Sequence, residues 1–571
     1  MNYNEKYQKW VSKEDLDPAL KAELLSMDET AKEDAFYTDV EFGTAGMRGI
    51  LGAGTNRLNI YVIQKANVGF AKYIASLPEG KERGVAIGYD NRHMSYKFAI
   101  ESAKVLATYG IKSYIFESLR PTPELSFAVR YLKCAGGIMI TASHNPKEHN
   151  GYKVYDDTGC QLLPEAADQV VQYVNEVEDE LNIKVFSDEE AYPYMTWIGE
   201  QEQLIHVIGK EVDEAYYKEV MAIEVNPGMD KSDFKIVFSP QHGTSNIAVR
   251  TCLTRLGYDL VPVLAQCAPD PDFSNTKSPN PEVPASYELA IKKAKEVDAD
   301  VVVITDPDGD RLGVVAKHNG EYVLMSGNQS AAVYLEYILS QMKEKGTLPD
   351  NAVMYNTIVT SDLGELVARS YGVDVEKTLT GFKFIGDKIR KYEQTHEKTF
   401  VFGYEESYGC VIKDFVRDKD AVQAVLTAAE AGNFYKKQGK DLVDVLNELY
   451  AKHGTFKETQ IALSKAGAAG AARIKEIMDN LRKDAPQEIG GVKVVKVEDY
   501  GNSTCSDGTT IQLPKSNVLK YYLEDGSWIA ARPSGTEPKC KFYFSIKGSD
   551  ADDAASKTEV FHKAMMEIIG E

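Results

Sequence analysis

Side chains in four loops of this sequence have the types and spacing needed for chemistry. The first loop, residues 141–146, reads Thr-Ala-Ser-His-Asn-Pro and follows an apolar segment that ends at residue 140. It presents Ser143 where a strand gives way to a loop, with His144 beside it and Lys153 ten residues later. Ligands of open α/β sheets bind just outside the carboxyl ends of strands, so Ser143 is a candidate nucleophile with acid–base assistance. An ordinary polar turn explains this loop equally well on its own.

The second loop carries three carboxylates at alternate positions. Residues 305–313 read Thr-Asp-Pro-Asp-Gly-Asp-Arg-Leu-Gly directly after the apolar segment 299–304. Asp306, Asp308 and Asp310 can therefore reach one centre, and hard oxygen ligands of this kind suit Mg²⁺. Burying them without a cation would be costly. The pattern predicts a magnesium site, with a solvated acidic turn as the alternative.

Calcium binding of the EF-hand type is excluded for this loop. An EF-hand needs glycine at its sixth position and glutamate at its twelfth, whereas here Gly309 is fourth and Lys317 is twelfth. Arg311 directly follows the last aspartate and could complement a phosphate group beside the metal.

The third and fourth loops suit binding. Residues 403–409 read Gly-Tyr-Glu-Glu-Ser-Tyr-Gly, and such carboxylates and hydroxyls could bind the hydroxyl groups of a sugar, although a plain surface loop is the alternative. Residues 532–539 read Arg-Pro-Ser-Gly-Thr-Glu-Pro-Lys, which are the components of a phosphate cradle, or of a simple Pro-Gly turn. The chain has no Walker A motif. Residues 43–49 and 90–95 add glycines and arginines that could surround an anionic centre.

The elements that must position these loops follow a repeated plan. Three stretches alternate helix-period segments with short Val/Ile-rich strands, which is typical of doubly wound α/β domains. The last stretch has an alanine-rich helix, alternating strands and a terminal helix, which reads as α+β. We predict strands at 84–90, 137–140, 234–238, 299–304, 353–355 and 399–402, then at 493–498, 518–523, 527–531 and 540–546, and helices at 97–109, 285–297, 329–343, 361–371, 421–437, 467–483 and 551–569.

The same pattern predicts four domains. They span residues 1–205, 206–325, 326–455 and 456–571, and carry in turn the serine, aspartate, glutamate and arginine loops. We expect linkers near 205–232, 320–330 and 452–460.

Bulk composition narrows the class of protein. The 571 residues include 43% hydrophobic and 26% charged side chains, as in ordinary globular proteins. A net charge of −21 disfavours a nucleic-acid or anionic-membrane surface, so any anionic substrate needs local clusters of cations. The seven cysteines are scattered and never spaced Cys-x-x-Cys, which predicts reduced cytosolic thiols.

Together and in this order, the four loops resemble the signature motifs of the α-D-phosphohexomutase superfamily, most closely its bacterial α-phosphoglucomutase branch. The resemblance covers essentially the whole chain. It implies three related doubly wound α/β domains and a C-terminal α+β domain, of the TATA-box-binding-protein-like type, around a central cleft. It also implies an intramolecular phosphotransferase that interconverts α-D-glucose 1-phosphate and glucose 6-phosphate through a phosphoserine enzyme and a glucose 1,6-bisphosphate intermediate.

The resemblance also implies a role for each matching residue. Ser143 would be the phosphoserine and a ligand of Mg²⁺, with Lys153 or His144 as the general acid–base, and Lys153 could act as a base only if its pKa were lowered. The implied set further comprises Arg311 in the catalytic centre; Asp306, Asp308 and Asp310 on the metal; Glu405 and Ser407 on the sugar hydroxyls; Arg532, Ser534, Gly535 and Thr536 on the non-reacting phosphate; and Arg48, Thr380, Gly381 and Lys419 as accessory contacts.

Several alternatives stay open at this stage. Phosphopentomutase, phosphomannomutase and sugar-bisphosphate synthase activities use the same scaffold, and Phe384 stands where relatives often carry tryptophan. A metal-dependent phosphatase and a non-catalytic sensor are rivals from other classes. We expect one Mg²⁺ per active site, glucose 1,6-bisphosphate as activator, sugar phosphates as the only partners, neither nucleic acid nor membrane, a monomer or weak homo-oligomer, and a cytoplasmic location.

Overall fold

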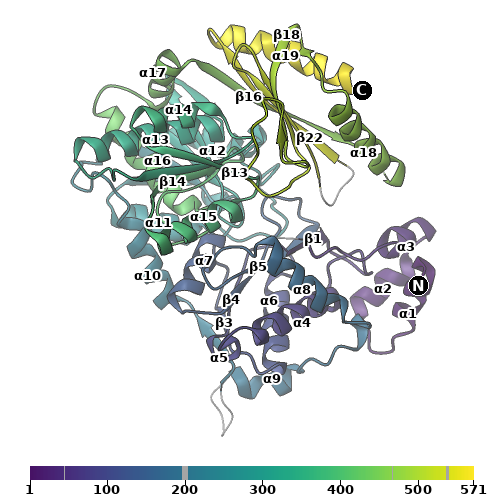
Figure 1. The fold of residues 1–571 in the computed structure, drawn as a ribbon. Helices are drawn as coiled ribbons and strands as arrows, with labels where there is room; N and C mark the ends of the chain where they lie inside the picture. The colour runs from purple at the N-terminus through teal and green to yellow at the C-terminus, as the bar shows by residue number, and fades with distance from the viewer. Residues whose placement is uncertain (44–45, 196–202, 466, 535–538) are drawn as a thin grey trace. The chain divides into compact units, whose positions relative to one another are not determined.

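The computed structural model describes residues 1–43, 46–195, 203–465, 467–534 and 539–571. These residues form two compact units (Figure 1). Two of the passages of the chain between the units fall inside helix α15 (Phe382–Thr395) and strand β14 (Thr399–Glu405). The first unit contains Met1–Met325, Ile385–Phe400 and Tyr408–Gln438, and the second contains Ser326–Phe384, Val401–Ser407 and Gly439–Glu571.

The first unit begins with a small helical cluster. The helices α1 (Tyr3–Ser12), α2 (Pro18–Ser26) and α3 (Glu29–Phe36) pack around Trp10. The Trp10 indole also donates a hydrogen bond of 2.8 Å to Glu180, which ties the cluster to the sheet domain that follows.

The first sheet has the strand order β1-β5-β4-β2-β3-β6. Its central strands are parallel, and β5 and β1 are added antiparallel at one edge. The sheet is therefore mixed, not purely parallel. Its strands are β1 (Gly46–Ile50), β2 (Val85–Tyr89), β3 (Ser113–Phe116), β4 (Gly136–Ile140), β5 (His149–Tyr155) and β6 (Ile205–Ile208), and its helices are α4 (Ile60–Ser76), α5 (Gly80–Arg83), α6 (Ser95–Thr108), α7 (Thr122–Tyr131), α8 (Pro164–Asn175) and α9 (Asp188–Met195).

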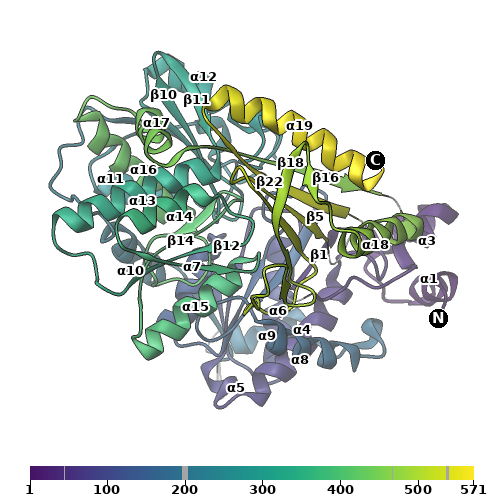
Figure 2. The same ribbon diagram turned by 45° about the horizontal axis from the view of Figure 1, so that its top comes forward.

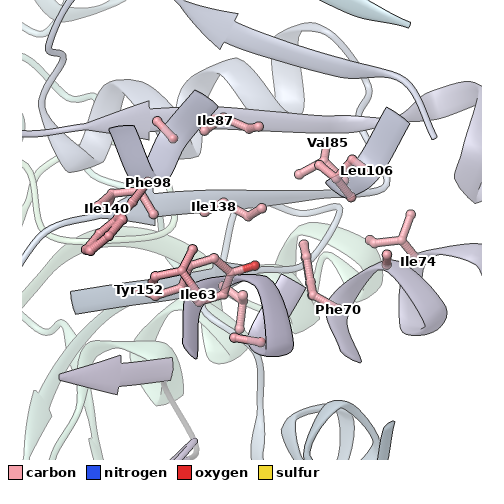
Figure 3. Close-up of a cluster of buried hydrophobic side chains, with 14 of the residues drawn as sticks. Ile63, Phe70, Ile74, Val85, Ile87, Phe98, Leu106, Ile138, Ile140 and Tyr152 are labelled. Atoms are coloured by element: carbon pink, nitrogen blue, oxygen red, sulfur yellow. The ribbon is translucent and has the colours of Figure 1, made fainter. Parts of the chain in front are cut away.

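Buried aliphatic and aromatic side chains fix this sheet against its helices. Ile87 and Ile138 from adjacent strands pack with Phe70 of α4 and Leu106 of α6 (Figure 3). Both β2 and β4 are buried along their whole length, as expected for parallel strands covered on both faces. The loops that leave the carboxyl ends of these strands therefore start from rigid positions.

The second sheet repeats the plan, with the order β11-β10-β9-β7-β8. Three strands are parallel, and a hairpin adds two antiparallel strands at one edge. Its strands are β7 (Lys235–Ser239), β8 (Asp259–Pro262), β9 (Val301–Thr305), β10 (Leu312–His318) and β11 (Glu321–Met325); α10 (Lys210–Met221), α11 (Asn246–Arg255), α12 (Glu288–Val297), α16 (Ala421–Lys436) and the short strand β15 (Gly409–Val411) complete the first unit.

The second unit contains strands β13 and β12 and residues Val401–Glu405 of β14, which belong to a sheet of order β13-β12-β14-β15, and a long antiparallel sheet. Strand β12 pairs in parallel with β13, and the C-terminal sheet has the order β16-β22-β21-β20-β18-β17, with helix α19 lying along it (Figure 2). The elements are α13 (Gly327–Glu344), β12 (Ala352–Thr357), α14 (Asp362–Ser370), β13 (Asp374–Thr378), α17 (Leu442–His453), β16 (Thr455–Ser464), α18 (Gly467–Lys483), β17 (Glu488–Ile489), β18 (Val492–Asp499), β19 (Thr504–Cys505), β20 (Leu519–Leu523), β21 (Trp528–Pro533), β22 (Lys539–Gly548) and α19 (Ala551–Ile569).

Most predicted elements are confirmed, but the segments predicted as linkers contain regular secondary structure. The segment 205–232 contains β6, which pairs with β3, and helix α10. Strand β11 lies in 320–330, and β16 begins inside 452–460. Short edge strands and helices rich in charged residues resemble loops in composition, which explains the error.

Two further features bear on the class of protein. Among the described residues, none of the helices combines the length and apolar character that a membrane span requires. All seven cysteines are free thiols.

Candidate active site

The three aspartates lie in the tight loop between β9 and β10, whose strands pair Thr305 with Leu312. Backbone amides of Asp310 and Arg311 donate to Asp306 Oδ1 at 3.0 and 2.9 Å, which folds the loop around that carboxylate. Gly309 has φ +67°, and a Cβ there would approach Pro121 to 2.8 Å, so only glycine fits.

The aspartate cluster fits a metal ion. Asp306, Asp308 and Asp310 are at most 2% exposed, and one oxygen of each lies within 4.8 Å of the others. Asp308 Oδ1 and Asp310 Oδ1 are buried and accept no hydrogen bond from the described residues. Burial raises the pKa of Asp306 well above its ordinary value, and the charges of the other two aspartates raise it further. A divalent cation would satisfy the open oxygens and offset this repulsion.

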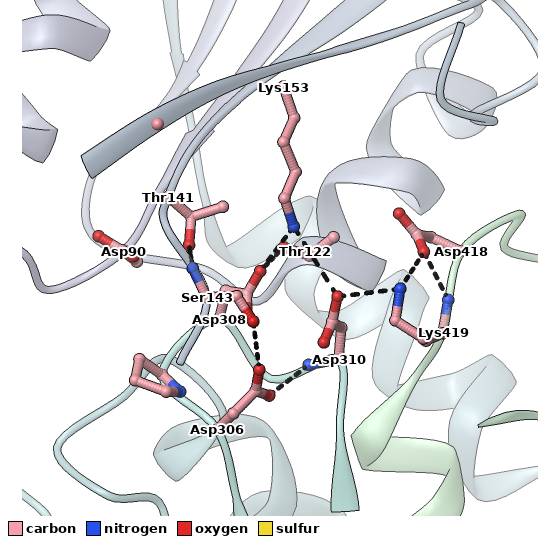
Figure 4. Close-up of polar contacts among 12 residues, drawn as sticks. Asp90, Thr122, Thr141, Ser143, Lys153, Asp306, Asp308, Asp310, Asp418 and Lys419 are labelled. Atoms are coloured by element: carbon pink, nitrogen blue, oxygen red, sulfur yellow. Dashed lines mark hydrogen bonds and ion pairs between the residues drawn. The ribbon is translucent and has the colours of Figure 1, made fainter. Parts of the chain in front are cut away.

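Ser143 points at this cluster from the carboxyl end of β4. Its Oγ donates a hydrogen bond of 2.7 Å to Asp306 Oδ2, and its amide donates to Thr141 Oγ1 at 2.8 Å. The residue is 3% exposed and has φ +51°, a left-handed conformation that is rare outside glycine. The strained backbone aims the hydroxyl away from the strand and toward the aspartates (Figure 4).

His144 contacts the serine directly. Its Nδ1 lies 3.2 Å from Ser143 Oγ. Burial lowers the pKa of His144 well below its usual range, and the positive charges of Arg311, Arg48 and Arg92 add to the effect. The imidazole is therefore neutral at physiological pH and can exchange a proton with the serine oxygen.

Lys153 reaches the aspartates from β5, which runs antiparallel to β4. Its Nζ lies 2.9 Å from Asp308 Oδ2 and 3.8 Å from Asp310 Oδ2. Burial lowers the pKa of Lys153, but attraction to Asp308, Asp310 and Asp418 outweighs it, so the pKa is raised. The lowered pKa that a general base requires is not found in this state, because the carboxylates hold the ammonium form.

Lys419 is a second cation at the cluster. Its Nζ lies 3.3 Å from Asp310 Oδ2 and 3.2 Å from Asp418 Oδ1 (Figure 4). Asp418 in turn accepts hydrogen bonds from Tyr155 and Gln161. This predicted accessory residue thus belongs to the charged network around the aspartates.

Two partners of the cluster were missed by sequence reasoning. At the start of α7, Thr122 donates its hydroxyl to Asp308 Oδ2 at 3.0 Å and its amide to the Asp308 carbonyl at 2.8 Å. Glu282 accepts a hydrogen bond of 2.7 Å from Arg311. The helix that begins just after β3 was the available signal for Thr122, since ligand groups gather at the carboxyl ends of strands. No sequence pattern distinguishes Glu282.

Arg48 lies at the edge of this centre. It is an exposed residue of β1, and its Nη1 donates to Asn145 Oδ1 at 3.1 Å. It therefore contacts the serine loop, as expected of an accessory residue, while its exposure leaves its side chain accessible to a ligand.

Residues 403–407 of the predicted sugar loop, including Glu405 and Ser407, lie in the second unit. Glu405 ends β14, is 8% exposed, and accepts a hydrogen bond of 2.9 Å from the amide of Gly381. Gly381 has φ +114°, which L-residues rarely adopt. Ser407 and Thr380 are half-buried. The structure therefore joins the two predicted segments through one backbone-to-carboxylate contact.

The predicted phosphate loop leaves the end of β21. Arg532 is half-buried, and the amide of Ser534 donates to the Lys539 carbonyl at 2.7 Å, which closes the loop. Gly535 and Thr536 lie outside the described residues. Burial raises the pKa of Tyr543 to about 12, and Glu406, Arg532 and Glu405 also act on it. Arg532 and the sugar loop therefore lie close to the same tyrosine.

Comparison with known proteins places these features in one family. Four models of phosphoglucomutase/phosphomannomutase domains match the chain, with alpha/beta/alpha domains I, II and III at residues 39–181, 214–320 and 326–453 and the C-terminal domain at 472–563. The phosphoglucomutase of Staphylococcus epidermidis is 40% identical over 533 residues, which cover 92% of this chain and 94% of the relative.

Solved structures share the fold. A putative phosphomannomutase from Thermus thermophilus has a TM-score of 0.68 at 21% identity, covering 94% of this chain and 100% of its own. The open form of a Paramecium phosphoglucomutase has a TM-score of 0.68 at 19% identity, covering 94% of this chain and 97% of its own. The four-domain α/β architecture is thereby established.

Proposed function

Because this chain belongs to the phosphoglucomutase/phosphomannomutase family of the α-D-phosphohexomutase superfamily, we propose that it carries phosphate on Ser143 while it interconverts sugar phosphates. The chain is an enzyme of the isomerase class and catalyses the phosphoglucomutase reaction, as its relatives of about 40% identity do. The residue roles, the metal and the bisphosphate intermediate described below are parts of the proposal.

One contact carries the proposal. The Ser143 hydroxyl lies 2.7 Å from Asp306 Oδ2, above two further aspartates with open oxygens. A phosphate on that oxygen would stand beside a cation held by Asp306, Asp308 and Asp310. A phosphatase would instead need an activated water in this place. It would not need a serine that points at the cluster.

We assign Mg²⁺ to the three aspartates and the phosphate of Ser143. When bound, Mg²⁺ would offset the negative charge that spreads over the transferred phosphoryl group. Arg311 is held beside Asp310 and Glu282 and would contribute a second positive charge at this point.

The transfer itself requires proton movement at two oxygens. The bond between phosphorus and Ser143 Oγ breaks, a bond to the free sugar hydroxyl forms, and the hydroxyl proton must leave. His144 is neutral and touches Ser143 Oγ, so it suits proton exchange with the serine. Lys153 would accept the sugar proton only when the charges of Asp308 and Asp310 are offset, since these charges hold its ammonium form.

The second unit would supply recognition. We propose that Glu405 and Ser407 bind sugar hydroxyls, with Thr380, Gly381 and Lys419 as accessory substrate contacts. The non-reacting phosphate would be bound by Arg532, Ser534, Gly535 and Thr536, with Arg48 as a further contact. A bisphosphate that turns around between two transfers lets one phosphate cradle serve both ends of the sugar. Glucose 1,6-bisphosphate would therefore act as intermediate and activator.

Further parts of the proposal concern the setting of the enzyme. We propose the domain limits 1–205, 206–325, 326–455 and 456–571. We also propose a monomer or weak homo-oligomer and a cytoplasmic location, which the seven free thiols support. Ribose and mannose phosphates remain the alternative substrates.

The test is a coupled assay with product analysis. Purified enzyme receives α-glucose 1-phosphate, Mg²⁺ and a trace of glucose 1,6-bisphosphate, and both glucose 6-phosphate and inorganic phosphate are measured. We expect glucose 6-phosphate without stoichiometric inorganic phosphate; release of phosphate without isomerised sugar would overturn the proposal. Parallel rates with ribose 1-phosphate and mannose 1-phosphate determine the preferred sugar.

A further inference from the structure

A buried arginine clamps the backbone of the serine loop. Arg92 follows β2, and its side chain is fully buried. Its Nη2 donates to the Ser143 carbonyl at 2.6 Å and to the Asn145 carbonyl, while its Nη1 donates to the carbonyls of Pro146 at 2.8 Å and His149 at 3.1 Å. One guanidinium group therefore holds four carbonyls of the loop that presents the phosphate carrier.

The arginine is itself fixed on two sides. The Arg92 Nε lies 3.4 Å from Asp90 Oδ2, and Asp90 Oδ1 accepts hydrogen bonds from the Arg92 amide at 2.9 Å and from Ser95 Oγ at 2.6 Å. On the other side, the Phe273 ring lies 5.1 Å from the guanidinium carbon. A carboxylate and an aromatic face therefore hold the charge in place.

Phe273 lies in a loop of the second sheet domain, and hydrogen bonds within this loop fix its position. The residue is buried at φ +52°, an uncommon backbone conformation for phenylalanine. Asp270 accepts hydrogen bonds from the amides of Asp272 and Ser274, and the Asp270 carbonyl accepts from Asn91 Nδ2 at 2.8 Å. The aspartate-bearing domain thus braces the arginine that holds the serine.

We propose that Arg92 is the positioning residue that keeps Ser143 in its transfer-competent conformation. The left-handed backbone of Ser143 costs free energy and persists only where its surroundings enforce it. Arg92 binds four carbonyl oxygens of the loop and fixes the direction in which they point. Because the backbone is held in this way, the Ser143 side chain points toward Asp306. This inference rests on the proposed role of Ser143 as phosphate carrier.

Only a guanidinium group can make this clamp. It offers five donors in one plane, whereas a lysine ammonium offers three donors from one point and cannot reach four spread carbonyls. Arg92→Lys keeps the positive charge beside Asp90 and loses the geometry. Arg92→Ala removes both the charge and the donor geometry. It leaves a space about the size of guanidinium, next to a groove of about 510 Å³ lined by Asn145, Pro146 and Phe273.

The test compares turnover with binding in these variants. We expect Arg92→Lys to lower kcat by about 10²-fold, because misplacement of a reacting group by about 1 Å has that effect, with KM for glucose 1-phosphate little changed. The transfer of phosphate from glucose 1,6-bisphosphate to Ser143 is measured by intact mass in a single turnover. Its rate should fall by the same factor. Millimolar guanidinium should restore part of the kcat of Arg92→Ala.

Arg83→Lys is the matched control. Arg83 also donates to two backbone carbonyls, those of Lys133 and Cys134, but these precede β4, whereas Ser143 follows it. We expect this variant to keep its kcat and to show no response to guanidinium. Urea unfolding of every variant separates loss of fold from loss of position.

The outcomes decide between positioning and general support. Equal losses of kcat in Arg92→Lys and Arg83→Lys, in step with stability and without guanidinium rescue, would overturn the inference. If Arg92→Ala does not fold, the kcat and the single-turnover rate of Arg92→Lys still distinguish positioning from general support. The proposed function fails separately, if Ser143→Ala retains turnover and phosphorylation or if the unchanged enzyme releases inorganic phosphate without isomerised sugar.

Discussion

Two lysines are buried in this molecule in opposite electrostatic states. In the first unit, Lys153 lies among Asp308, Asp310 and Asp418, whose charges raise its pKa against the effect of burial. In the second unit, Lys520 is completely buried, and burial lowers its pKa to about 7. The first keeps its charge in the interior and the second is close to losing it.

The surroundings explain the contrast. The Lys153 ammonium has carboxylate oxygens at 2.9 and 3.8 Å. The Lys520 Nζ donates to the Ile358 carbonyl at 2.7 Å and lies 3.9 Å from the Trp528 ring, while Asp362 acts on it only at longer range. A carbonyl and a ring do not offset the loss of water around an ammonium group, whereas direct carboxylate contacts do.

The difference shows what each region is built for. The first unit concentrates opposite charges around one serine, at a cost in free energy that a catalytic centre can repay. The second unit uses Lys520 to join β20 to the loop that begins at Ile358. The preceding residue, Thr357 at the end of β12, donates to Glu406, which lies beside the proposed sugar ligand Glu405. Changes in the first region should therefore affect chemistry, and changes in the second should affect binding and stability.

Removal of the proposed phosphate carrier is the largest expected change. Ser143→Ala should abolish turnover, because no other hydroxyl is predicted to carry phosphate between the two transfers. Steady-state rates, together with intact mass after incubation with glucose 1,6-bisphosphate, measure this. Ser407→Ala, in the second unit, is the control and should remain phosphorylated on Ser143. A phosphorylated, active Ser143→Ala protein would end the carrier role.

Removal of one charge from the aspartate cluster comes next. Asp308→Asn should weaken Mg²⁺ binding and lower kcat by about 10²- to 10³-fold, as expected for loss of one electrostatic group at a transition state. It also removes the closest partner of the Lys153 ammonium. Calorimetric Mg²⁺ titration and the rate at saturating metal measure the two effects.

An exposed aspartate of the same unit provides the comparison for this variant. Asp272 pairs with Lys147 and His93 at the surface and lies outside the cluster. Asp272→Asn should bind Mg²⁺ as the unchanged enzyme does. Equal Mg²⁺ affinity in Asp308→Asn would show that the three buried aspartates do not form the metal site.

The cluster and its partners Ser143 and Lys153 were predictable from sequence, whereas the roles of Thr122 and Arg92 were not. An apolar run followed by aspartates at alternate positions identifies Asp306, Asp308 and Asp310, because strand ends and metal ligands have local signatures. Thr122 and Arg92 act on residues that lie tens or hundreds of positions away along the chain. The role of Arg92 depends on strand order, which places β2 beside β4, and no local pattern encodes that order. The role of Thr122 depends on contact between the first sheet domain and the aspartate loop of the second.

The elements show the same division. Long periodic segments such as 467–483 were predicted to the residue, since α18 spans Gly467–Lys483. The sequence predicts a linker where the edge strand β6 lies. The four residues of β6 gain their stability from pairing with β3, which is distant in the sequence. Lys520 illustrates the limit most clearly, since its sequence context is that of an ordinary alternating strand, whereas the structure buries it completely.

A change in the phosphate loop should affect binding more than chemistry. Arg532→Ala should raise KM for glucose 1-phosphate by about 10- to 100-fold, because a charge-assisted contact to phosphate contributes about 1.5–3 kcal/mol, with a much smaller change in kcat. Full Michaelis curves measure both constants. Arg473→Ala, which removes an arginine that pairs with Glu476 and Glu571 on the same domain, is the control. A fall in kcat without a change in KM would contradict the division between the units.

The effect expected to leave activity least changed concerns stability at Lys520. The folded protein holds this lysine with a pKa of about 7, whereas an exposed lysine has a pKa of about 10.4. Between these values the unfolded chain binds more protons, so the free energy of unfolding should rise with pH, by at most about 1.4 kcal/mol per pH unit. Lys520→Met removes the titrating group, so this rise between pH 7 and about 10 should disappear, with kcat nearly unchanged.

Urea unfolding at several pH values measures this slope. The control is Lys475→Met, an exposed lysine that pairs with Asp479 and should leave the pH slope as it is. If Lys520→Met keeps the slope of the unchanged protein, Lys520 is charged in the folded state and is stabilised by the Trp528 ring as a cation. The two buried lysines would then share one state, and the contrast between the charged centre of the first unit and the neutral joint of the second would have to be abandoned.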